Sequence, residues 1–455
     1  MSAQPRAGLL VALAVLAACH EARIPAARRE QPRPNVLLIT LDTTRADRLG
    51  CYGGAKPLTP SLDELAAQGC VFLDATAQAS VTPVSHASIM TGRYPYHHRL
   101  RVLHGLRANR LPDDETTLAE ILERRGYDTA AFVSAFPVTE RFGLDQGFAH
   151  FDADFPRQAT AVSRRGVVST SESQRRADAT TGAALRWLER ASSPWLLWVH
   201  YFDPHDLVLM PPPEFLLAFT IDHSDPRQML RDLYDAEVAY MDQEIGRLLD
   251  RLRTCEQYDR TLVVAVADHG EGLGEHQWWT HGLLYQEQLH VPLIIRAPGA
   301  PAGQRVRTLV RTIDIVPTIL AQLALESPAR MDGIDLSGLL DASGHAPELT
   351  AYSDSLDAIH AQHTDAILDQ KQEPLFSLRD GRFKLIVHQG AAARTERFDL
   401  ELDPHETRDL GAAAGLVPDL GRELAAHMAS APWHADDLPM SAEDLEQLEA
   451  IGYGK

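Results

Sequence analysis

The chain of 455 residues carries 43 lysines and arginines against 63 aspartates and glutamates, a formal net charge of −20. This length accommodates one large α/β domain with a smaller one appended. The acidic balance argues against nucleic acid as a partner, because a surface that binds phosphate backbones needs clustered positive charge. An anionic substrate would therefore have to be held by local positive charge, from a metal ion and histidines.

The N-terminus has the pattern of a secretion signal. One arginine precedes an apolar run over residues 9–18, which is too short to cross a bilayer as a helix. The run ends in LAAC, which resembles the lipobox of bacterial lipoproteins. We therefore predict a signal peptide over residues 1–19, lipidation of Cys19, and a flexible tether over residues 20–33. This places the protein in the bacterial cell envelope, lipid-anchored in the periplasm or on the outer membrane. The alternative is an ordinary cleaved signal with a chance cysteine.

Taken in chain order, apolar runs alternate with amphipathic stretches. The run NVLLITLD over residues 35–42 is aliphatic without alternation, which is typical of a strand buried on both faces of a parallel sheet. A helix is predicted over residues 59–69, with Thr59 as its N-cap and a proline next to it. The same reasoning predicts further strands within residues 127–134, 194–205, 260–270 and 291–299, and further helices within residues 116–126, 172–190, 230–252 and 313–324.

This alternation of strands and helices predicts an α/β fold, with a mainly parallel central sheet and helices on both of its faces. The polar, unpatterned residues 155–171 are interpreted as a surface excursion. Past residue 346 the pattern changes, and two alternating runs joined by Asp380 and Gly381 predict a hairpin. We therefore expect a catalytic domain over residues 34–345 and a small antiparallel C-terminal subdomain over residues 346–455.

The candidate site combines a hydroxyl residue with carboxylates at the ends of predicted strands. Thr82 lies four residues before His86 in a Ser/Thr/Pro-rich segment that we interpret as a nucleophile turn, and Asp42, Asp268 and His269 each follow an apolar run. Threonine is a weak nucleophile unless a base or a metal activates it. The set Asp42, Thr82, Asp268 and His269 fits a tetrahedral zinc or a similar cation. Taken singly, such an aspartate is also often a helix cap and DHG often only a turn.

Three segments, TPVSHASIMTGR, LDTTRADRLGCYG and ADHGEGLGEH, resemble the sulfatase family of the alkaline phosphatase superfamily, and the resemblance runs from residue 34 to the end. It implies that family's fold, one bound divalent metal and hydrolysis of anionic esters. In the usual pattern the nucleophile is a cysteine or serine that is matured to formylglycine, followed by an arginine. Here those two positions are Thr82 and His86. A threonine cannot become the aldehyde, so the formylglycine mechanism is closed to this chain.

Three further departures concern the metal and the substrate. A second metal aspartate of the usual pattern is Thr43, and the loss of one carboxylate favours zinc or manganese over calcium. The usual GKWHLG is VSAFPV at residues 133–138, and a usual lysine is His281. The remaining set is similar to the single-metal threonine sites of phosphoethanolamine transferases and nucleotide pyrophosphatase-like phosphodiesterases.

These observations give three hypotheses. In the first, a metal-dependent hydrolase cleaves sulfate or phosphate esters of small molecules, glycans or lipids by attack of Thr82. His86, His205 and His281 then contact ester oxygens or protonate the leaving group. In the second, a phosphodiesterase or phosphoryl-group transferase acts on surface glycans or lipids. In the third, the protein is a non-catalytic glycan-binding relative. Asp203, His205 and His281 are also a candidate for a partial second metal site.

Overall fold

A computed structural model describes the greater part of the chain after residue 32. Compactness divides the chain into Met1–Arg33 and Pro34–Lys455, and the second unit contains all of the described helices and strands. The predicted signal peptide, Cys19 and all of the predicted tether except Arg33 lie outside the described residues. No helix within the described ranges is long and apolar enough to span a bilayer. The structure describes residues 33–101, 110–155, 158–162, 168–171, 173–205, 209–219, 221, 224–341, 344, 348–356, 373–389, 393–411, 418–430 and 446–447.

The central sheet confirms the α/β prediction. Among the described residues it contains nine strands in the order β10-β2-β9-β8-β1-β7-β3-β4, with β11 also paired to β2. The pairs from β8 to β4 are parallel, whereas β9 runs antiparallel to both β2 and β8. The strand bounds are β1 Asn35–Leu41, β2 Cys70–Thr76, β3 Asp128–Phe132, β4 His150–Asp152, β7 Trp195–Tyr201, β8 Thr261–Ala267, β9 His290–Arg296, β10 Gln304–Val306 and β11 Val310–Arg311.

The middle of this sheet is wholly buried. Every residue of β1, β7 and β8 is buried, as expected for parallel strands covered on both faces. Their register aligns Leu41 with Tyr201 and with Ala267. The three strands therefore end together, and the residues that come after them meet at one edge of the sheet.

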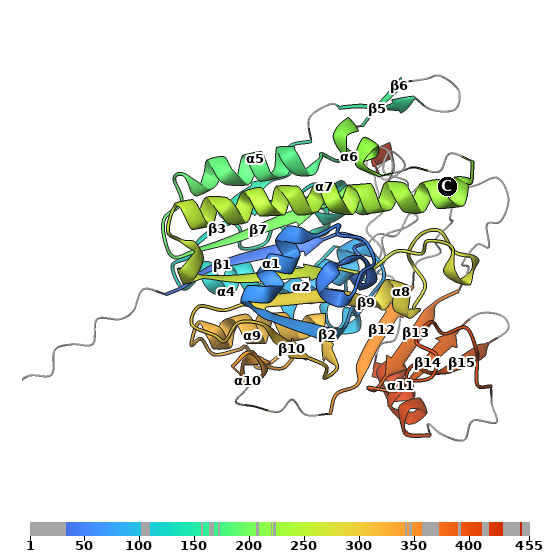
Figure 1. Cartoon of the computed structure of the whole chain (residues 1–455). Coiled ribbons are helices and arrows are strands. Elements are labelled where there is room, and N and C mark those ends of the chain that lie inside the picture. Colours follow the sequence, from blue (N-terminus) through green and yellow to red (C-terminus); the bar gives the residue numbers. More distant parts are fainter. Residues whose placement is uncertain are drawn as a thin grey trace, which may run out of the picture. The chain divides into compact units, whose positions relative to one another are not determined.

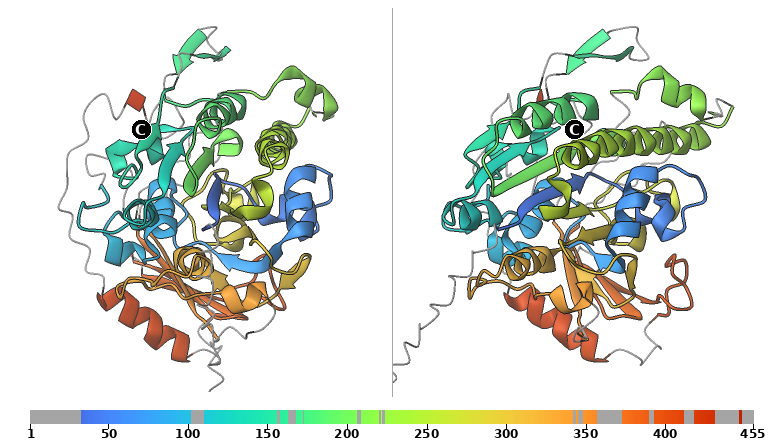
Figure 2. Two further views of the ribbon diagram at one scale, coloured as in Figure 1. Left: turned by 90° about the vertical axis from the view of Figure 1, so that its left-hand side faces the viewer. Right: turned by 60° about the vertical axis from the view of Figure 1, so that its left-hand side comes forward.

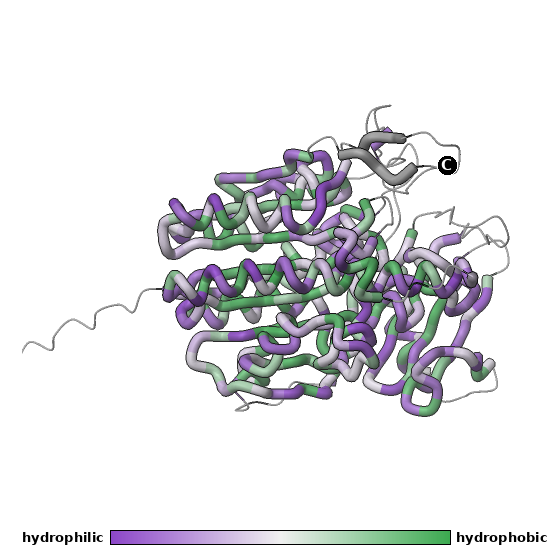
Figure 3. The backbone as a smooth tube through the Cα atoms, turned by 45° about the horizontal axis from the view of Figure 1, so that its top comes forward, coloured by the Kyte–Doolittle hydropathy of each residue, from purple (hydrophilic) through white to green (hydrophobic). Residues whose placement is uncertain are grey.

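Helices cover both faces of the sheet (Figures 1 and 2). Helices α1, α5 and α7 pack together on one face, and α2 packs with α4 and α9 on the other. The apolar strands lie inside and the helices alternate between apolar and polar residues (Figure 3). The helix bounds are α1 Pro60–Gln68, α2 Thr82–Thr91, α3 Pro95–His98, α4 Leu118–Glu123, α5 Ala177–Leu188, α6 Pro213–Ala218, α7 Pro226–Thr254, α8 Gln286–Leu289, α9 Ile315–Gln322, α10 Ser337–Leu340 and α11 Pro418–Ser430.

The predicted C-terminal antiparallel sheet is also present. Strands β12 (Ala351–Ser355), β13 (Leu375–Arg379), β14 (Phe383–His388) and β15 (Arg394–Asp399) pair in chain order, and α11 packs on β13 and β14. Ser353 Oγ donates to Ala77 O, and Ser355 Oγ donates to Gly282 O. The small sheet is thus bonded to the segments that lead into α2 and that come after His281.

Within residues 155–171, which were interpreted as a surface excursion, β5 (Gln158–Val162) and β6 (Val168–Ser171) form a two-stranded antiparallel sheet. One local prediction was wrong. The segment expected to form a nucleophile turn is instead helical from Thr82 onward. Proline is tolerated in the first turn of a helix, where backbone N–H groups have no intrahelical partner. Pro83 lies in the first turn and therefore does not break this helix.

Candidate active site

Thr82 is the first residue of α2, and all ten residues of this helix are buried. Its Oγ1 lies 3.3 Å from His269 Nε2, and the nearby hydroxyl partly offsets the rise in the pKa of Asp42. The first backbone N–H groups of a helix and its dipole favour an anion at this end. The hydroxyl therefore stands where an anionic ester is favoured.

Each of the two aspartates has one oxygen held by protein donors and one oxygen without a hydrogen bond. Asp42 Oδ2 lies 3.0 Å from His200 Nε2, and Asp42 Oδ1 is buried without a partner. Asp268 Oδ1 accepts from the backbone N–H groups of Thr43 (3.1 Å) and His269 (2.8 Å), whereas its Oδ2 has no hydrogen bond. Thr43 adopts a positive φ of 50°, which is unusual for a β-branched residue and aims its N–H at Asp268.

The tautomers of two histidines follow from their backbone partners. His269 Nδ1 donates to Gly270 O at 2.9 Å, so its Nε2 carries the lone pair that faces Thr82 and lies 3.3 Å from Asp268 Oδ2. His86 Nδ1 donates to Thr82 O at 2.8 Å and lies 3.5 Å from Asp268 Oδ2. Its Nε2 is buried without a hydrogen bond. Both rings thus keep a lone pair available inside the site.

The charges in this cluster fit a bound cation. Burial raises the pKa of Asp42 well above its usual value, and the neighbouring carboxylates of Asp268 and Glu271 add to the shift. Burial likewise raises the pKa of Asp268 and lowers that of His86 to about 4. At neutral pH the carboxylates therefore face uncharged imidazoles, and a divalent ion would compensate their buried charge.

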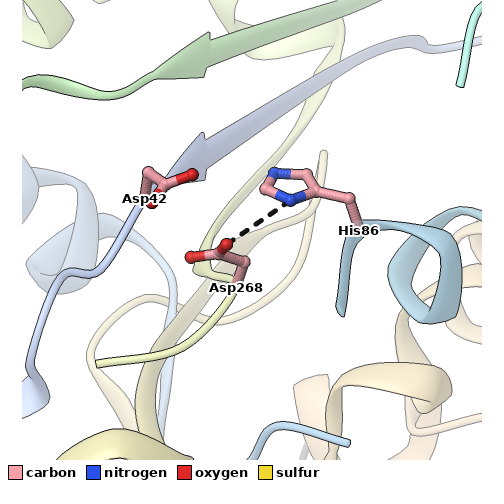
Figure 4. A group of neighbouring side chains, drawn as sticks. All are labelled: Asp42, His86 and Asp268. Atoms are coloured by element: carbon pink, nitrogen blue, oxygen red, sulfur yellow. Dashed lines mark ion pairs between the residues drawn. The ribbon is translucent and has the colours of Figure 1, made fainter. Parts of the chain in front are cut away.

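The arrangement of donor atoms is also suited to a bound cation. Asp42, His86 and Asp268 each offer an atom, and these atoms lie within 4.8 Å of one another. The three side chains point toward a common space from the end of β1, from α2 and from the segment after β8 (Figure 4). Within the described residues this is the one such group of three or more metal-ligating side chains. It places His86, predicted to contact ester oxygens or to protonate the leaving group, among the possible ligands. The ligand roles of Thr82 and His269 stay predictions.

The other two predicted histidines lie beside this cluster. His281 Nδ1 donates to Ser80 O at 2.8 Å, and its Nε2 lies 3.2 Å from His205 Nε2. The rings of His281 and His269 are 4.6 Å apart. The structure therefore brings Thr82, His86, His205 and His281 together with the predicted metal ligands, whereas Cys19 lies outside the described residues. Asp203 was the third candidate for a partial second metal site with His205 and His281. One of its oxygens, Oδ1, is occupied by a hydrogen bond from Ala177 N at 2.9 Å.

Comparison with protein-family models gives two matches. Residues 34–325 match the family model described as sulfatase, and residues 274–430 match that of the N-sulphoglucosamine sulphohydrolase C-terminal region. The chain belongs to the sulfatase family. It is accordingly an ester hydrolase of that family.

Individual sulfatases are similar over most of their length. The chain is 23% identical to N-acetylglucosamine-6-O-sulfatase of Bacteroides thetaiotaomicron, over 84% of this chain and 83% of that protein. It is 25% identical to arylsulfatase A of Homo sapiens, over 86% of each. A solved structure with its substrate D-glucosamine-2-N,6-O-disulfate shares the fold with a TM-score of 0.72 and 21% identity, covering 88% of this chain and 98% of that one. The solved structure of a phosphonate monoester hydrolase of Agrobacterium radiobacter has a TM-score of 0.66 and 24% identity, covering 88% of this chain and 95% of that one.

Sequence reasoning missed two residues of this sulfatase site. Glu271 is buried beside the aspartates, and burial raises its pKa. His200 contacts Asp42 directly, and the sequence did not predict this contact. A possible sequence signal for Glu271 was its position directly after the Asp-His-Gly segment. No sequence signal pairs His200 with Asp42, because their contact depends on how β1 and β7 align.

Proposed function

We propose that this sulfatase-family protein is a metal-dependent hydrolase of singly charged sulfate or phosphorus esters, with Thr82 as its nucleophile and without formylglycine. The observation that carries the proposal is the position of the Thr82 hydroxyl. It lies at the N-terminus of α2, beside His269 Nε2 and Asp42, where the unpartnered donor atoms of two carboxylates meet. A non-catalytic glycan-binding relative would not need this convergence on a hydroxyl.

The residues that would hold the ion are Asp42 and Asp268 with His269, and His86 or Thr82 completes the set. A zinc or manganese ion at this place supplies Lewis-acid stabilisation of negative charge on oxygen. The Thr82 hydroxyl loses its proton to solvent, and its oxygen attacks sulfur or phosphorus in line as the bond to the leaving alcohol breaks. The N-terminus of α2 favours the negative ester group. Water then cleaves the covalent ester on Thr82.

The pair of His205 and His281 is suited to serve the leaving group. Ser80 O holds the proton of His281 on Nδ1, so His281 Nε2 accepts and His205 Nε2 donates when both rings are neutral. A histidine near neutral pH can pass a proton to a departing oxygen. This pair therefore offers the general acid.

The charge of the site supports a singly charged substrate. His86 is uncharged at neutral pH because its pKa is lowered to about 4. Neutral rings near the metal ligands suit a sulfate monoester, a phosphodiester or a phosphonate monoester better than a doubly charged phosphate monoester. Relatives named for glycan sulfates and for phosphonate monoesters support the same range. Transfer of a phosphoryl-linked group to a surface glycan or lipid would use the same Thr82 intermediate.

The test is turnover of an aryl phosphodiester and of the matching aryl sulfate by zinc- and manganese-loaded protein. We expect Thr82→Ala to lower kcat by about four orders of magnitude on the better substrate. Thr82→Ser is the matched control, because it keeps the hydroxyl, and it should retain activity within about tenfold of wild type. Chelation of the metal should abolish turnover and metal addition should restore it.

Each outcome has a meaning. Faster phosphodiester cleavage would show phosphorus esters as the substrate class, and faster sulfate cleavage would show that a threonine supports sulfuryl transfer. An unaffected Thr82→Ala variant, or turnover that survives chelation, would overturn the proposal.

A further inference from the structure

His200 is buried on β7, an interior strand of the central sheet. It lies on β7 opposite Thr40 of β1, one position before the strand ends, and its side chain is fully buried. Its ring contacts that of His86 edge-on, with centroids 5.0 Å apart, and Phe202 and Trp198 lie on either side of it. The ring is therefore held by packing before any hydrogen bond is considered.

The tautomer of His200 is determined by its neighbour Ser134. The backbone N–H of Ser134 points at His200 Nδ1 at 3.2 Å. A backbone N–H can only donate, so Nδ1 must accept and the ring proton must be on Nε2. His200 Nε2 therefore donates to Asp42 Oδ2, 3.0 Å away.

Ser134 is itself fixed on several sides. Its Oγ donates to His200 O at 2.6 Å and shares a hydrogen bond of 2.7 Å with Thr180 Oγ1 on α5. Its carbonyl accepts from Arg175 N at 2.8 Å. The donor that selects the His200 tautomer is thus as well held as the ring.

We propose that His200 is a positioning residue for the metal site: its Nε2–H fixes one oxygen of Asp42 and leaves the other as a single, oriented ligand atom. Asp42 Oδ1 is the buried oxygen without a hydrogen bond, on the carboxylate that faces His86 and Asp268. Asp268 has the same division, with backbone N–H groups in place of the imidazole. The inference rests on the proposed metal site, but not on the nucleophile or the substrate.

Without this donor, Asp42 would lose the partner of a buried oxygen. The carboxylate could then turn and offer either oxygen, or both, to the ion. Partners that orient metal ligands usually contribute tenfold to a hundredfold in metal affinity. The effect should therefore appear in metal binding itself, before any catalytic step.

Two substitutions separate the roles of the two ring nitrogens. In His200→Asn, the amide oxygen can replace Nδ1 as acceptor for Ser134 N–H, but no atom reaches Asp42. In His200→Gln, the longer side chain can place its amide N–H near Nε2 and restore the bond to Asp42, at the expense of the Ser134 contact. A role in packing alone would not distinguish them in this order.

The measurement is the zinc dissociation constant of the purified full chain, determined by competition with a chromophoric chelator. We expect His200→Asn to weaken zinc binding by about 10-fold to 100-fold, and His200→Gln to stay within about threefold of wild type. Thermal unfolding of the metal-free proteins is recorded alongside and should differ little between the two variants.

The outcomes separate this inference from the proposed function. If wild type binds no zinc or manganese, the metal site itself is wrong. If wild type binds zinc and His200→Asn binds it equally well, or if Asn and Gln weaken binding equally, only the positioning role is overturned.

Should the variants not fold, neutron diffraction of the wild-type protein still decides the tautomer. A deuteron on His200 Nε2, directed at Asp42, is expected. A deuteron on Nδ1 would overturn the inference.

Discussion

At the residue scale, burial sets the charge of Asp203, two residues before His205. Its carboxyl is buried, Oδ1 accepts from Ala177 N at 2.9 Å, and burial raises its pKa to about 7. In the unfolded chain the same group titrates near 3.9. Because the folded state holds this proton more tightly, the contribution of Asp203 to stability is greatest below about pH 4 and falls as the pH rises to about 7.

Replacement of this residue should therefore change the pH dependence of stability. Asp203→Asn keeps an acceptor for Ala177 N but does not titrate. Its free energy of unfolding relative to wild type should rise between about pH 4.5 and pH 8, by at most about 3 kcal/mol. Urea unfolding at the two pH values measures this. Asp113→Asn, at an exposed site, is the control and should show no such change; an equally flat difference for Asp203→Asn would contradict the pKa shift.

At the element scale, helix α1 is capped by another helix. Thr59 is its N-cap residue, as predicted, but the hydroxyl of Thr59 accepts from Gly50 N at 3.1 Å and makes no cap bond. Asp242 of α7 accepts from the backbone N–H groups of Ser61 and Leu62, each at 2.9 Å. The cap therefore also joins two helices on one face of the sheet.

Loss of this cap should cost more than loss of an exposed carboxylate on the same helix. Asp242→Ala leaves two backbone N–H groups without their acceptor, and we expect the free energy of unfolding to fall by about 1–3 kcal/mol. Asp250→Ala, which removes a surface ion pair with Arg253, is the matched control and should change it by less than about 0.5 kcal/mol. Urea unfolding midpoints compare the stabilities of the two variants. An equal loss of stability in both would mean that the cap contributes nothing beyond an exposed ion pair.

At the scale of the whole molecule, a buried ion pair joins the small sheet to the segment of His281. Lys384 Nζ on β14 lies 2.7 Å from Glu406 Oε1, and both side chains are fully buried. Lys384 Nζ also donates to Gln286 Oε1 at 3.2 Å, and Glu406 accepts from Gln286 N. Gln286 begins α8, five residues after His281. The C-terminal sheet thus holds the start of α8, a short distance in sequence from His281.

Breaking this pair from one side should be more harmful than removing its charges together. Lys384→Met leaves the Glu406 carboxylate buried and uncompensated, and we expect a loss of about 3–5 kcal/mol in the free energy of unfolding. The double variant Lys384→Met/Glu406→Gln keeps an acceptor for Gln286 N and should recover most of that loss. Urea unfolding of wild type, Lys384→Met, Glu406→Gln and the double variant tests this, and strictly additive losses would argue against a coupled pair.

The sequence alone was enough for the features that local pattern encodes. Apolar runs without alternation identified β1 and β8, and the polar residues directly after them placed Asp42, Asp268 and His269 at one edge of a parallel sheet. The turn residues Asp380 and Gly381 identified the C-terminal hairpin. Such signals are short in range, since strand periodicity and turn chemistry depend on neighbouring residues.

Tertiary structure alone decided which distant groups meet. The bond between His200 and Asp42 spans 158 positions and exists because β1 and β7 align Thr40 with His200. Tertiary packing also decides that β9 runs antiparallel to its neighbours. It likewise decides that Asp242 of α7, and not the Thr59 hydroxyl, accepts from the first N–H groups of α1. Register, strand direction and side-chain partners are set by the packing of many residues at once, and no local pattern carries that information.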